Sequence, residues 1–425
     1  MLKKTFILVL VLAMLVSATA MAEVTNRDMQ LMGGVVVSNA SDSFFFAPME
    51  EGMTKHWGLY ALSKASEGPL VEIQDGYPAR LIHADNERVY FFGYTDAERS
   101  VHALYSVEIA TQAYEELLTD IKDVFVGETA DEFLYTKSDN PYTLRSYNLT
   151  EKKDKSVKDM SKSDKTIYDA GIYDGRTYFI TRTTSGAEDG YEYHEGSGKA
   201  TNLDKPSPQL LTGMLYEGYR LYVTDQQGIM VYAVKLGNKN ANQLGAAYAV
   251  SLKNPRFGEY IYTYGGDNNE LIALPLDGSE PLKLKLEGST LVRMVLGGSK
   301  DQLMLINDNA IYGITPNLTS QTKLIDFDQR TGGQAWSHVA PAGSNAIMVF
   351  GYGQDTLTSA SNLMPTGVYA YDKTTGDMLF GFPEWDPNAE PAEPAETSNT
   401  RPETIGAPNE EKEEGETYFV FSSGG

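Results

Sequence analysis

A repeat of about 44 residues runs through most of this 425-residue chain and restricts its fold more than any other feature. Short clusters of aromatic and β-branched residues recur at intervals of 39 to 46 residues. The central residues of the eight clusters are Phe45, Phe91, Leu134, Phe179, Tyr222, Ile261, Met304 and Met348. Such a period is typical of architectures that stack one supersecondary unit many times.

Each repeat has the pattern of four strands. The aromatic cluster follows a turn signal such as Asp174-Gly175, and a second strand with alternating large and small residues comes next, as from Leu104. A turn such as Asp277-Gly278-Ser279 leads to a third strand, and a further strand, such as 35–38, precedes each cluster. We therefore predict an all-β chain, with residues 23–383 forming a β-propeller of eight four-stranded blades and seven blades as the alternative.

The first 22 residues have the pattern of a secretory signal peptide. Two lysines precede an apolar run from Phe6 to Val16, and Ala20-Met21-Ala22 matches the small-residue site at which signal peptidase cuts. Eleven apolar residues are too few to span a bilayer, which takes about 20. We expect cleavage after Ala22, a secreted or extracytoplasmic mature protein, and no membrane insertion after cleavage.

The C-terminal residues differ in composition from the repeats. Residues 384–416 hold eleven acidic and two basic side chains and five prolines, a composition that predicts a disordered linker. Residues 417–425 then include the strand-like piece Thr417 to Ser422. Three readings stay open for this piece: pairing with an exposed edge of the propeller, docking on another protein's sheet, or a frayed end.

Charge and cysteine content exclude several functions. The formal net charge is −23, which repels polyphosphate, so we expect no nucleic-acid partner. An acidic surface favours a soluble monomer. The chain has no cysteine, which excludes thiolate metal sites, cysteine nucleophiles and disulfides.

The pattern resembles a known family. It consists of an aromatic strand, then a Leu-Tyr strand, then a turn such as Leu276-Asp277-Gly278-Ser279. This order resembles that of a family of secreted bacterial β-propeller domains, which are described as similar to the propellers of low-density-lipoprotein-receptor-related proteins. The receptor signature Tyr-Trp-Thr-Asp is absent, and residues 221–225 come nearest to it. The resemblance implies an extracytoplasmic propeller with a binding function.

A second resemblance concerns two turns. Residues 371–380 contain the Asp-x-x-Thr-Gly turn of quinoprotein-like propeller repeats, and residues 328–336 hold a looser copy that ends in Trp336. This resemblance implies a quinone-binding propeller as an alternative. Aspartate, threonine and glycine are also common in tight hairpin turns, so turn geometry alone can explain this motif.

The sequence holds few candidates for catalysis. Its five histidines lie far apart, and no metal-binding, hydrolase-elbow or phosphate-loop motif occurs. We expect no metal, no cofactor and no enzymatic activity. A polysaccharide-active propeller enzyme that uses two or three carboxylates at the channel mouth is the alternative, and no pair of acids can be selected from the sequence.

Three long loops, each between an aromatic cluster and the strand that follows it, indicate a binding face. They cover residues 47–57, 94–102 and 351–367, and in a closed ring they belong to neighbouring blades. The candidate ligand-binding residues on them are His56, Trp57, Tyr94, Tyr352 and Gln354. The expected function is binding or scaffolding at the cell envelope, through recognition of a protein or a cell-surface glycan on one face of the propeller.

Overall fold

The computed structural model describes residues 34–383, apart from 50–55, 75–76, 96–100, 127–130, 196, 204–211, 225–229, 239, 247–255, 266–269, 287–294, 300–301, 308–309, 327–334 and 353–366. The signal segment (1–22), the acidic linker (384–416) and the terminal segment (417–425) of the sequence analysis lie outside these residues. Within the described ranges, no helix has the length and hydropathy needed to cross a membrane.

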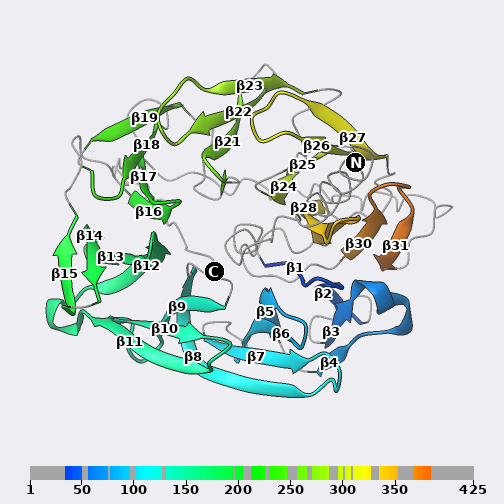
Figure 1. Ribbon diagram of the computed structural model, residues 1–425, viewed down its shortest axis with the longest axis horizontal. Coiled ribbons are helices and arrows are strands. Elements are labelled where there is room, and N and C mark those ends of the chain that lie inside the picture. Colours follow the sequence, from blue (N-terminus) through cyan, green and yellow to red (C-terminus); the bar gives the residue numbers. More distant parts are fainter. Residues whose placement is uncertain are drawn as a thin grey trace, which may run out of the picture.

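Antiparallel sheets contain almost all of the regular secondary structure of the described chain, and they stand side by side in a ring (Figure 1). Six sheets have four strands and one has seven, and in each sheet strands that follow one another in sequence are neighbours. None of these sheets closes on itself. The prediction of an all-β, propeller-like fold is confirmed.

The strand bounds follow the predicted repeat. The first two sheets contain β1 (Val36–Ser38), β2 (Ser43–Pro48), β3 (His56–Ala61) and β4 (Val71–Gln74), then β5 (Tyr77–Ala84), β6 (Arg88–Tyr94), β7 (His102–Glu108), β8 (Tyr114–Val126), β9 (Glu132–Lys137), β10 (Thr143–Asn148) and β11 (Lys153–Asp159). The third and fourth sheets contain β12 (Thr166–Tyr173), β13 (Arg176–Arg182), β14 (Glu188–His194), β15 (Lys199–Asn202), β16 (Thr212–Tyr216), β17 (Tyr219–Thr224), β18 (Met230–Lys235) and β19 (Ala241–Ala246).

The remaining three sheets continue around the ring. They contain β20 (Arg256–Phe257), β21 (Tyr260–Gly265), β22 (Glu270–Pro275), β23 (Leu282–Lys285), β24 (Val295–Ser299), β25 (Gln302–Asn307), β26 (Ala310–Ile314), β27 (Gln321–Asp326), β28 (Ala335–Ala342), β29 (Ala346–Tyr352), β30 (Gly367–Asp372) and β31 (Met378–Phe382). Two short 3₁₀ helices, η1 (Leu62–Glu67) and η2 (Ser161–Ser163), complete the described elements.

In the seven-stranded sheet, the two halves of one long strand, β8, pair with different neighbouring strands. The first part of β8 pairs with β7, through contacts such as Glu116 with Tyr105. The later part pairs with β9, through contacts such as Phe125 with Leu134. Ile121 pairs with both neighbours, and the β8–β9 pairing shifts register between Ile121 and Val124. One 13-residue strand thus joins two hairpin systems into a single sheet.

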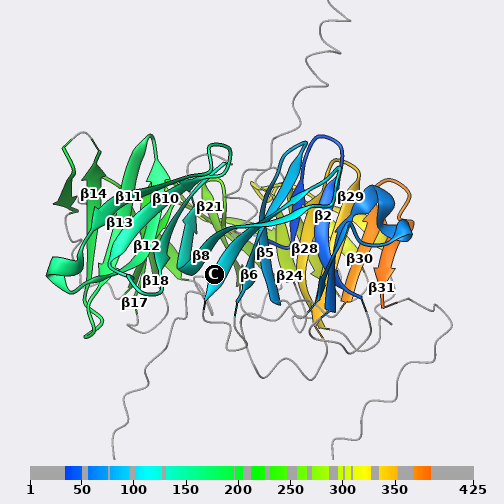
Figure 2. The same ribbon diagram turned by 90° about the horizontal axis from the view of Figure 1, so that it is seen from below.

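The middle strands are buried on both faces because each sheet stands between two others (Figure 2). All six residues of β2 are buried, and in β6 the run from Val89 to Phe92 is at most 4% exposed. Apolar clusters fill the spaces between neighbouring sheets. Each sheet therefore depends on its neighbours to bury its apolar faces. This burial stabilises the fold by roughly 25 cal/mol for each Å² of apolar surface removed from water.

A bulge recurs in the outermost strand of several repeats. In five places the outermost strand contains one extra, unpaired residue. This residue lies opposite the step between an apolar residue of the third strand and the residue that follows it. The extra residue is apolar each time: Leu117, Val157, Leu244, Leu324 and Leu379. The first four pack on clusters that join their own repeat to the next one.

The ring closes by side-chain packing between the first and last sheets. Phe380 of β31 contacts the rings of Phe45 and Tyr60, with centroid distances of 5.1 and 5.3 Å. The Gly343 amide donates to the Ser38 hydroxyl at 3.2 Å. In the part of the chain that the structure describes, both sheets consist of consecutive strands, so no strand is shared across this seam.

A buried ion pair joins the third and fourth sheets. The Glu188 carboxylate of β14 accepts from Arg182 of β13 at 2.6 Å and lies 3.6 Å from the Arg220 guanidinium of β17. The side chains of Glu188 and Arg220 are each 6% exposed. Removing one partner of such a pair leaves a buried charge without compensation.

We predict that Glu188→Gln lowers the free energy of unfolding by on the order of 3 kcal/mol, because Arg220 then keeps its charge in a buried site. Chemical denaturation measures this change. The control is Glu192→Gln, which breaks the pair with Arg176, a side chain that is 63% exposed. The control has a much smaller effect, because water screens an exposed ion pair. Equal losses in the two variants would contradict the prediction.

A second prediction concerns acid stability. Burial lowers the pKa of His338 on β28 to about 4. Between about pH 6.5, the ordinary value, and pH 4 the unfolded chain binds a proton here that the folded chain does not, so stability falls as the pH falls through this window. We predict that the melting temperature of His338→Gln decreases less than that of the wild type between about pH 6.5 and pH 4, because the variant lacks this imidazole. The control variant His194→Gln removes an exposed imidazole instead.

Candidate functional site

Three consecutive sheets each have an acidic residue in the turn between their first and second strands. The two-residue turns are Asp174-Gly175, Glu217-Gly218 and Gly258-Glu259, each between the first and second strands of its sheet. Both residues of the first two turns have positive φ, between 46 and 74°. This is the geometry of type I′ turns, which match the twist of a hairpin and favour glycine and asparagine.

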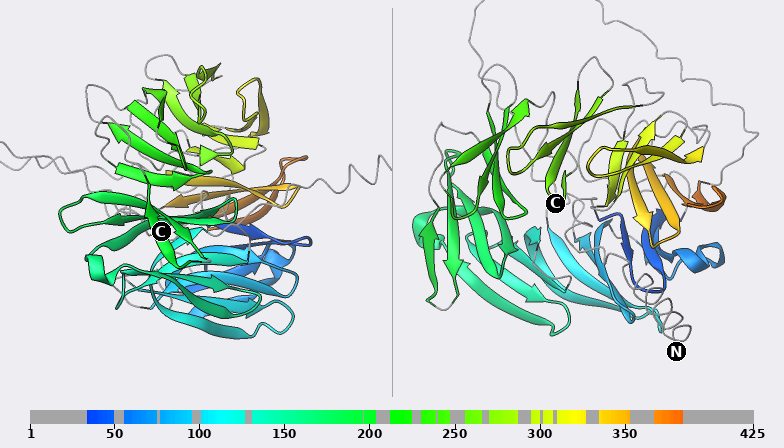
Figure 3. Two further views of the ribbon diagram at one scale, coloured as in Figure 1. Left: turned by 60° about the vertical axis from the view of Figure 1, so that its left-hand side comes forward. Right: turned by 45° about the horizontal axis from the view of Figure 1, so that its top comes forward.

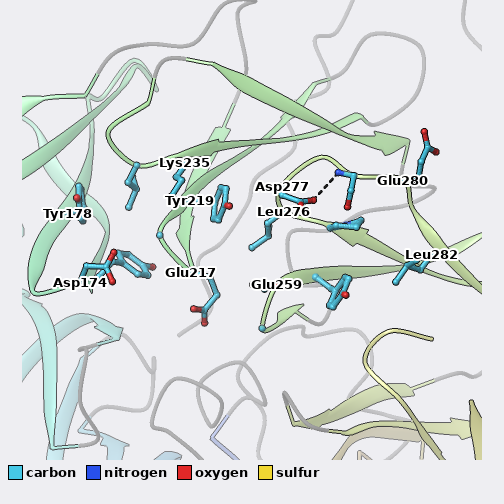
Figure 4. A pocket seen from close by; sticks show the side chains of 17 residues that line it. Asp174, Tyr178, Glu217, Tyr219, Lys235, Glu259, Leu276, Asp277, Glu280 and Leu282 are labelled. Atoms are coloured by element: carbon cyan, nitrogen blue, oxygen red, sulfur yellow. Dashed lines mark hydrogen bonds between the residues drawn. The ribbon is translucent and has the colours of Figure 1, made fainter. Parts of the chain in front are cut away.

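These turns border a pocket of about 530 Å³ that spans three sheets (Figure 4). Turns between the third and fourth strands form the rest of its wall. The lining includes residues of β12, β13, β17, β18, β21, β22 and β23. The pocket lies on one side of the ring, at the end of the strands where first-to-second connections occur. A pocket of this size accommodates a few amino-acid side chains or sugar units.

The charge of the pocket is strongly negative. Its lining holds one ammonium group, that of Lys235, and five carboxylates: Asp174, Glu217, Glu259, Asp277 and Glu280. All of these carboxylates except that of Glu217 belong to exposed residues. The Ser279 backbone amide donates to Asp277 at 2.9 Å and holds the pKa of that carboxyl below its ordinary value. Asp277 is therefore ionised throughout the neutral range.

Four tyrosine rings contribute to the apolar part of the lining, together with Leu236, Pro275, Leu276 and Leu282. Tyr173, Tyr178, Tyr219 and Tyr260 all border the pocket. Tyr178 is 5% exposed, and burial raises the pKa of its hydroxyl, so it remains neutral. Tyrosine faces next to carboxylates attract cations, through the ring quadrupole as well as through charge.

Hydrogen bonds fix the walls of the pocket. The Leu236 amide donates to the Gly218 carbonyl, and the Leu276 amide donates to the Glu259 carbonyl, each at 2.9 Å. Each bond ties a third-to-fourth-strand turn to the first-to-second-strand turn of the same sheet. The Tyr216 hydroxyl donates to the Gly258 carbonyl at 3.0 Å and joins two sheets. The pocket is thus largely formed before any ligand arrives.

Four of the five residues that the sequence analysis selected are described, and they lie at the opposite end of the strands. His56 begins β3 and its imidazole is 3.7 Å from the Glu72 carboxylate. Trp57 is 4% exposed and packs in the largest apolar cluster. Tyr94 is 7% exposed and contacts the His102 ring at 4.3 Å. The structure therefore buries both of these aromatic side chains.

The other two selected residues give less information. Tyr352 ends β29, where it pairs with Ala335, and Gln354 lies outside the described residues. The central parts of all three long loops (50–55, 96–100 and 353–366) also lie outside them. The proposed loop face thus remains a prediction.

The Asp-x-x-Thr-Gly turn has a local explanation. The Asp372 carboxylate accepts from the backbone amides of Thr374 and Thr375 at 2.7 and 2.8 Å, and Gly376 has a φ of 79°. These amides lower the pKa of Asp372. The motif thus forms the hairpin between β30 and β31.

One carboxyl away from the pocket has a raised pKa. Burial raises the pKa of Asp123 on β8, against the hydrogen bond from Thr136 and the charges of Lys122 and Arg80. Burial also lowers the pKa of Arg80 to about 10, and its guanidinium lies 5.4 Å from the centre of the Phe92 ring. Among the residues of the described ranges, no group of three or more histidine, aspartate or glutamate side chains is arranged to hold a metal ion.

Comparison with known proteins yields structural likenesses alone. No protein-family model matches the chain. No curated protein matches it either. Solved structures similar to it include the β-propeller domain of the Trilobed protease from Pyrococcus furiosus, at 8% identity and a TM-score of 0.41, covering 73% of this chain and 99% of that one.

Two further solved structures show the range of the likeness. The acylaminoacyl peptidase of Pyrococcus horikoshii is 10% identical with a TM-score of 0.42, and the match covers 72% of this chain and 52% of the peptidase. TolB from Acinetobacter baumannii is 10% identical with a TM-score of 0.34, and the match covers 67% of this chain and 80% of TolB. These values carry no information on what this chain binds, and the description of the fold rests on its own strand topology.

The pocket was not selected from the sequence, although a signal for it exists. Asp174 was recognised as a turn residue, and turn geometry alone explained it. The additional signal is the recurrence of an acidic residue beside glycine at intervals of 43 and 42 residues, at Asp174, Glu217 and Glu259. That recurrence predicts turns at one end of three consecutive sheets. It does not show that a hollow lies between them.

We predict that the double variant Asp174→Asn, Glu217→Asn folds with a melting temperature equal to or slightly above that of the wild type. Asparagine is favoured at the positive-φ position before glycine in a type I′ turn, and the change removes two neighbouring negative charges. Thermal unfolding measures the effect. Asp174→Val is the contrasting variant, because a β-branched residue is strained at positive φ, and it lowers the melting temperature. A large loss in the asparagine variant would contradict the assigned turn geometry.

Proposed function

We propose that this chain is a secreted, non-enzymatic binding protein of the cell envelope that recognises a positively charged protein segment at the acidic tyrosine pocket. The observation that supports this proposal most directly is the arrangement of Asp174, Glu217 and Glu259 on three consecutive turns around one cavity. Lysine and arginine side chains complement such a lining, by ion pairing and by contact with tyrosine faces.

We further propose that the body is an eight-bladed propeller. The count follows if the two parts of β8 belong to separate blades, one with β5–β7 and one with β9–β11. Eight aromatic clusters in the sequence agree with this division. The resemblance to secreted propellers related to lipoprotein-receptor domains belongs to the same proposal, as does secretion through the N-terminal segment.

Electrostatics supports a cationic partner over an anionic or neutral one. The whole chain has a formal net charge of −23, so its field attracts a basic partner from a distance. Four of the five pocket carboxylates belong to exposed residues, so salt screens their attraction. Binding therefore weakens steeply as the ionic strength rises, and the association rate decreases with it.

The test uses a lysine hexapeptide and its fully Nε-acetylated form as probes. We predict saturable binding of the lysine peptide to the full-length protein and at least tenfold weaker binding of the acetylated peptide, by isothermal titration calorimetry at low salt. The variant Asp174→Asn, Glu217→Asn, Glu259→Gln loses at least tenfold in affinity, because three charges leave the pocket while the turns are kept.

The matched control changes three acids outside the pocket. Glu72, Asp139 and Asp164 do not line it, and their neutralisation to the amides removes the same charge. Affinity that falls equally in both triple variants would show a general charge effect and reject the pocket as the site. Equal binding of the lysine and acetylated peptides would reject the cationic partner.

A glycan partner on the opposite face is the competing outcome. A glycan array with the same variants distinguishes the two. Glycan binding that survives the pocket variant and is lost on changing His56 and Tyr352 to alanine would favour the loop face.

A further inference from the structure

The last peripheral strand differs from the others in composition. The strands β4, β11, β15, β19, β23 and β27 stand at the rim of the ring (Figure 3), and each contains a charged or amide side chain. Such residues protect a sheet edge from pairing with another strand. β31 has the sequence Met-Leu-Phe-Gly-Phe and contains no such residue.

β31 also differs from the other peripheral strands in the exposure of its apolar side chains. Of the large apolar side chains in the described ranges, three are exposed: Tyr114 at 46%, Met378 at 39% and Leu379 at 47%. Two of these three are adjacent on β31. An apolar strand at the edge of a sheet, with backbone groups directed outward, is a template for a further strand.

The extra residue of the recurring bulge allows the exposure of β31 to be compared with that of the other outermost strands. Leu244 occupies in β19 the place that Leu379 occupies in β31, and it is 3% exposed. Leu117, Val157 and Leu324 are also packed on apolar clusters at this place. Leu379 is the member of this set that is exposed, although its position in the repeat is the same.

The seam of the ring explains the difference. Each of the other four bulge residues packs where its repeat meets the next one along the chain. β31 meets the first sheet instead, where Phe380 packs on Phe45 and Tyr60 and where η1 lies beside it. The first sheet thus covers Phe380 and leaves Met378 and Leu379 exposed.

We propose that residues 417–422 of this same chain pair with the free edge of β31 as a fifth strand of the last sheet. Their sequence, Thr-Tyr-Phe-Val-Phe-Ser, is uncharged and consists mainly of residues that favour strands. It matches the apolar edge in both length and character. The acidic residues before it, which carry eleven negative charges, are unsuited to cover Leu379.

The length of the connecting chain fits this pairing. β31 ends at Phe382, and 34 residues (383–416) separate the last sheet from the terminal segment. A flexible chain of this length spans roughly 30 Å. A five-residue strand is about 17 Å long, so the segment reaches the edge in either direction. Because the partner is tethered, pairing is intramolecular and has a high effective concentration.

The test compares amide hydrogen exchange in the full-length protein and in a variant that lacks residues 417–425. We predict that exchange of the outward-facing amides of residues 378–382 becomes at least tenfold faster in the deletion variant, while exchange in β23 is unchanged. Adding a synthetic peptide of residues 416–422 to the deletion variant restores the protection in a saturable way. Full-length Phe419→Asp, Phe421→Asp behaves as the deletion does.

Two controls separate this pairing from other effects. Tyr114→Ser removes the third exposed apolar side chain and leaves exchange in β31 unchanged. Sedimentation velocity of the full-length protein shows a monomer at all concentrations at which β31 is protected. Unchanged exchange after deletion would overturn the proposal, as would protection that rises with protein concentration, which would indicate pairing between copies. Neither result depends on the acidic tyrosine pocket.

Discussion

The rest of the structure depends on the burial of both faces of every sheet. A four-stranded sheet whose second strand is Ser-Phe-Phe-Phe-Ala-Pro, buried at all six positions, has no face that water can cover. Such a sheet is stable only between two neighbours, and the same is true of those neighbours. The ring satisfies this condition, because every sheet in it has a neighbour on either side. Stability is therefore a property of the interfaces between sheets, as in other repeat proteins.

Much of this fold could be predicted, because repetition and alternation are properties of sequence. The aromatic cluster around Phe91 and the turn at Asp277 were assigned correctly to a strand and to a hairpin. The long strand β8 was not foreseen, because its second half, Ile121 to Val126, continues the first without a glycine or proline to mark a break. Whether two hairpin systems share one strand depends on backbone pairing, which residue types do not encode strongly.

The candidate site could be predicted less well, for a physical reason. The side chain of an aromatic residue at a loop boundary can point into the core or toward solvent, and the neighbouring sequence does not determine which. Trp57 and Tyr94 were selected as binding residues, but the structure packs both inside, where their large apolar area is removed from water. The acidic pocket arises from the opposite situation. The turn at Glu217 has one local geometry whatever surrounds it, and its role comes only from the turns of the sheets on either side.

The seam between the first and last sheets has a consequence for how such a chain changes over evolutionary time. In the described ranges both sheets consist of consecutive strands, so the ring is held shut without interlocking of its two ends. Duplication of one repeat of about 44 residues, with ends that fall between sheets, adds a complete unit and interrupts none of the existing ones. The circumference of the ring is thereby free to vary between relatives. A ring with a different number of repeats would bring its first and last sheets together at a different angle, so the contacts of Phe380 with Phe45 and Tyr60 would have to form anew.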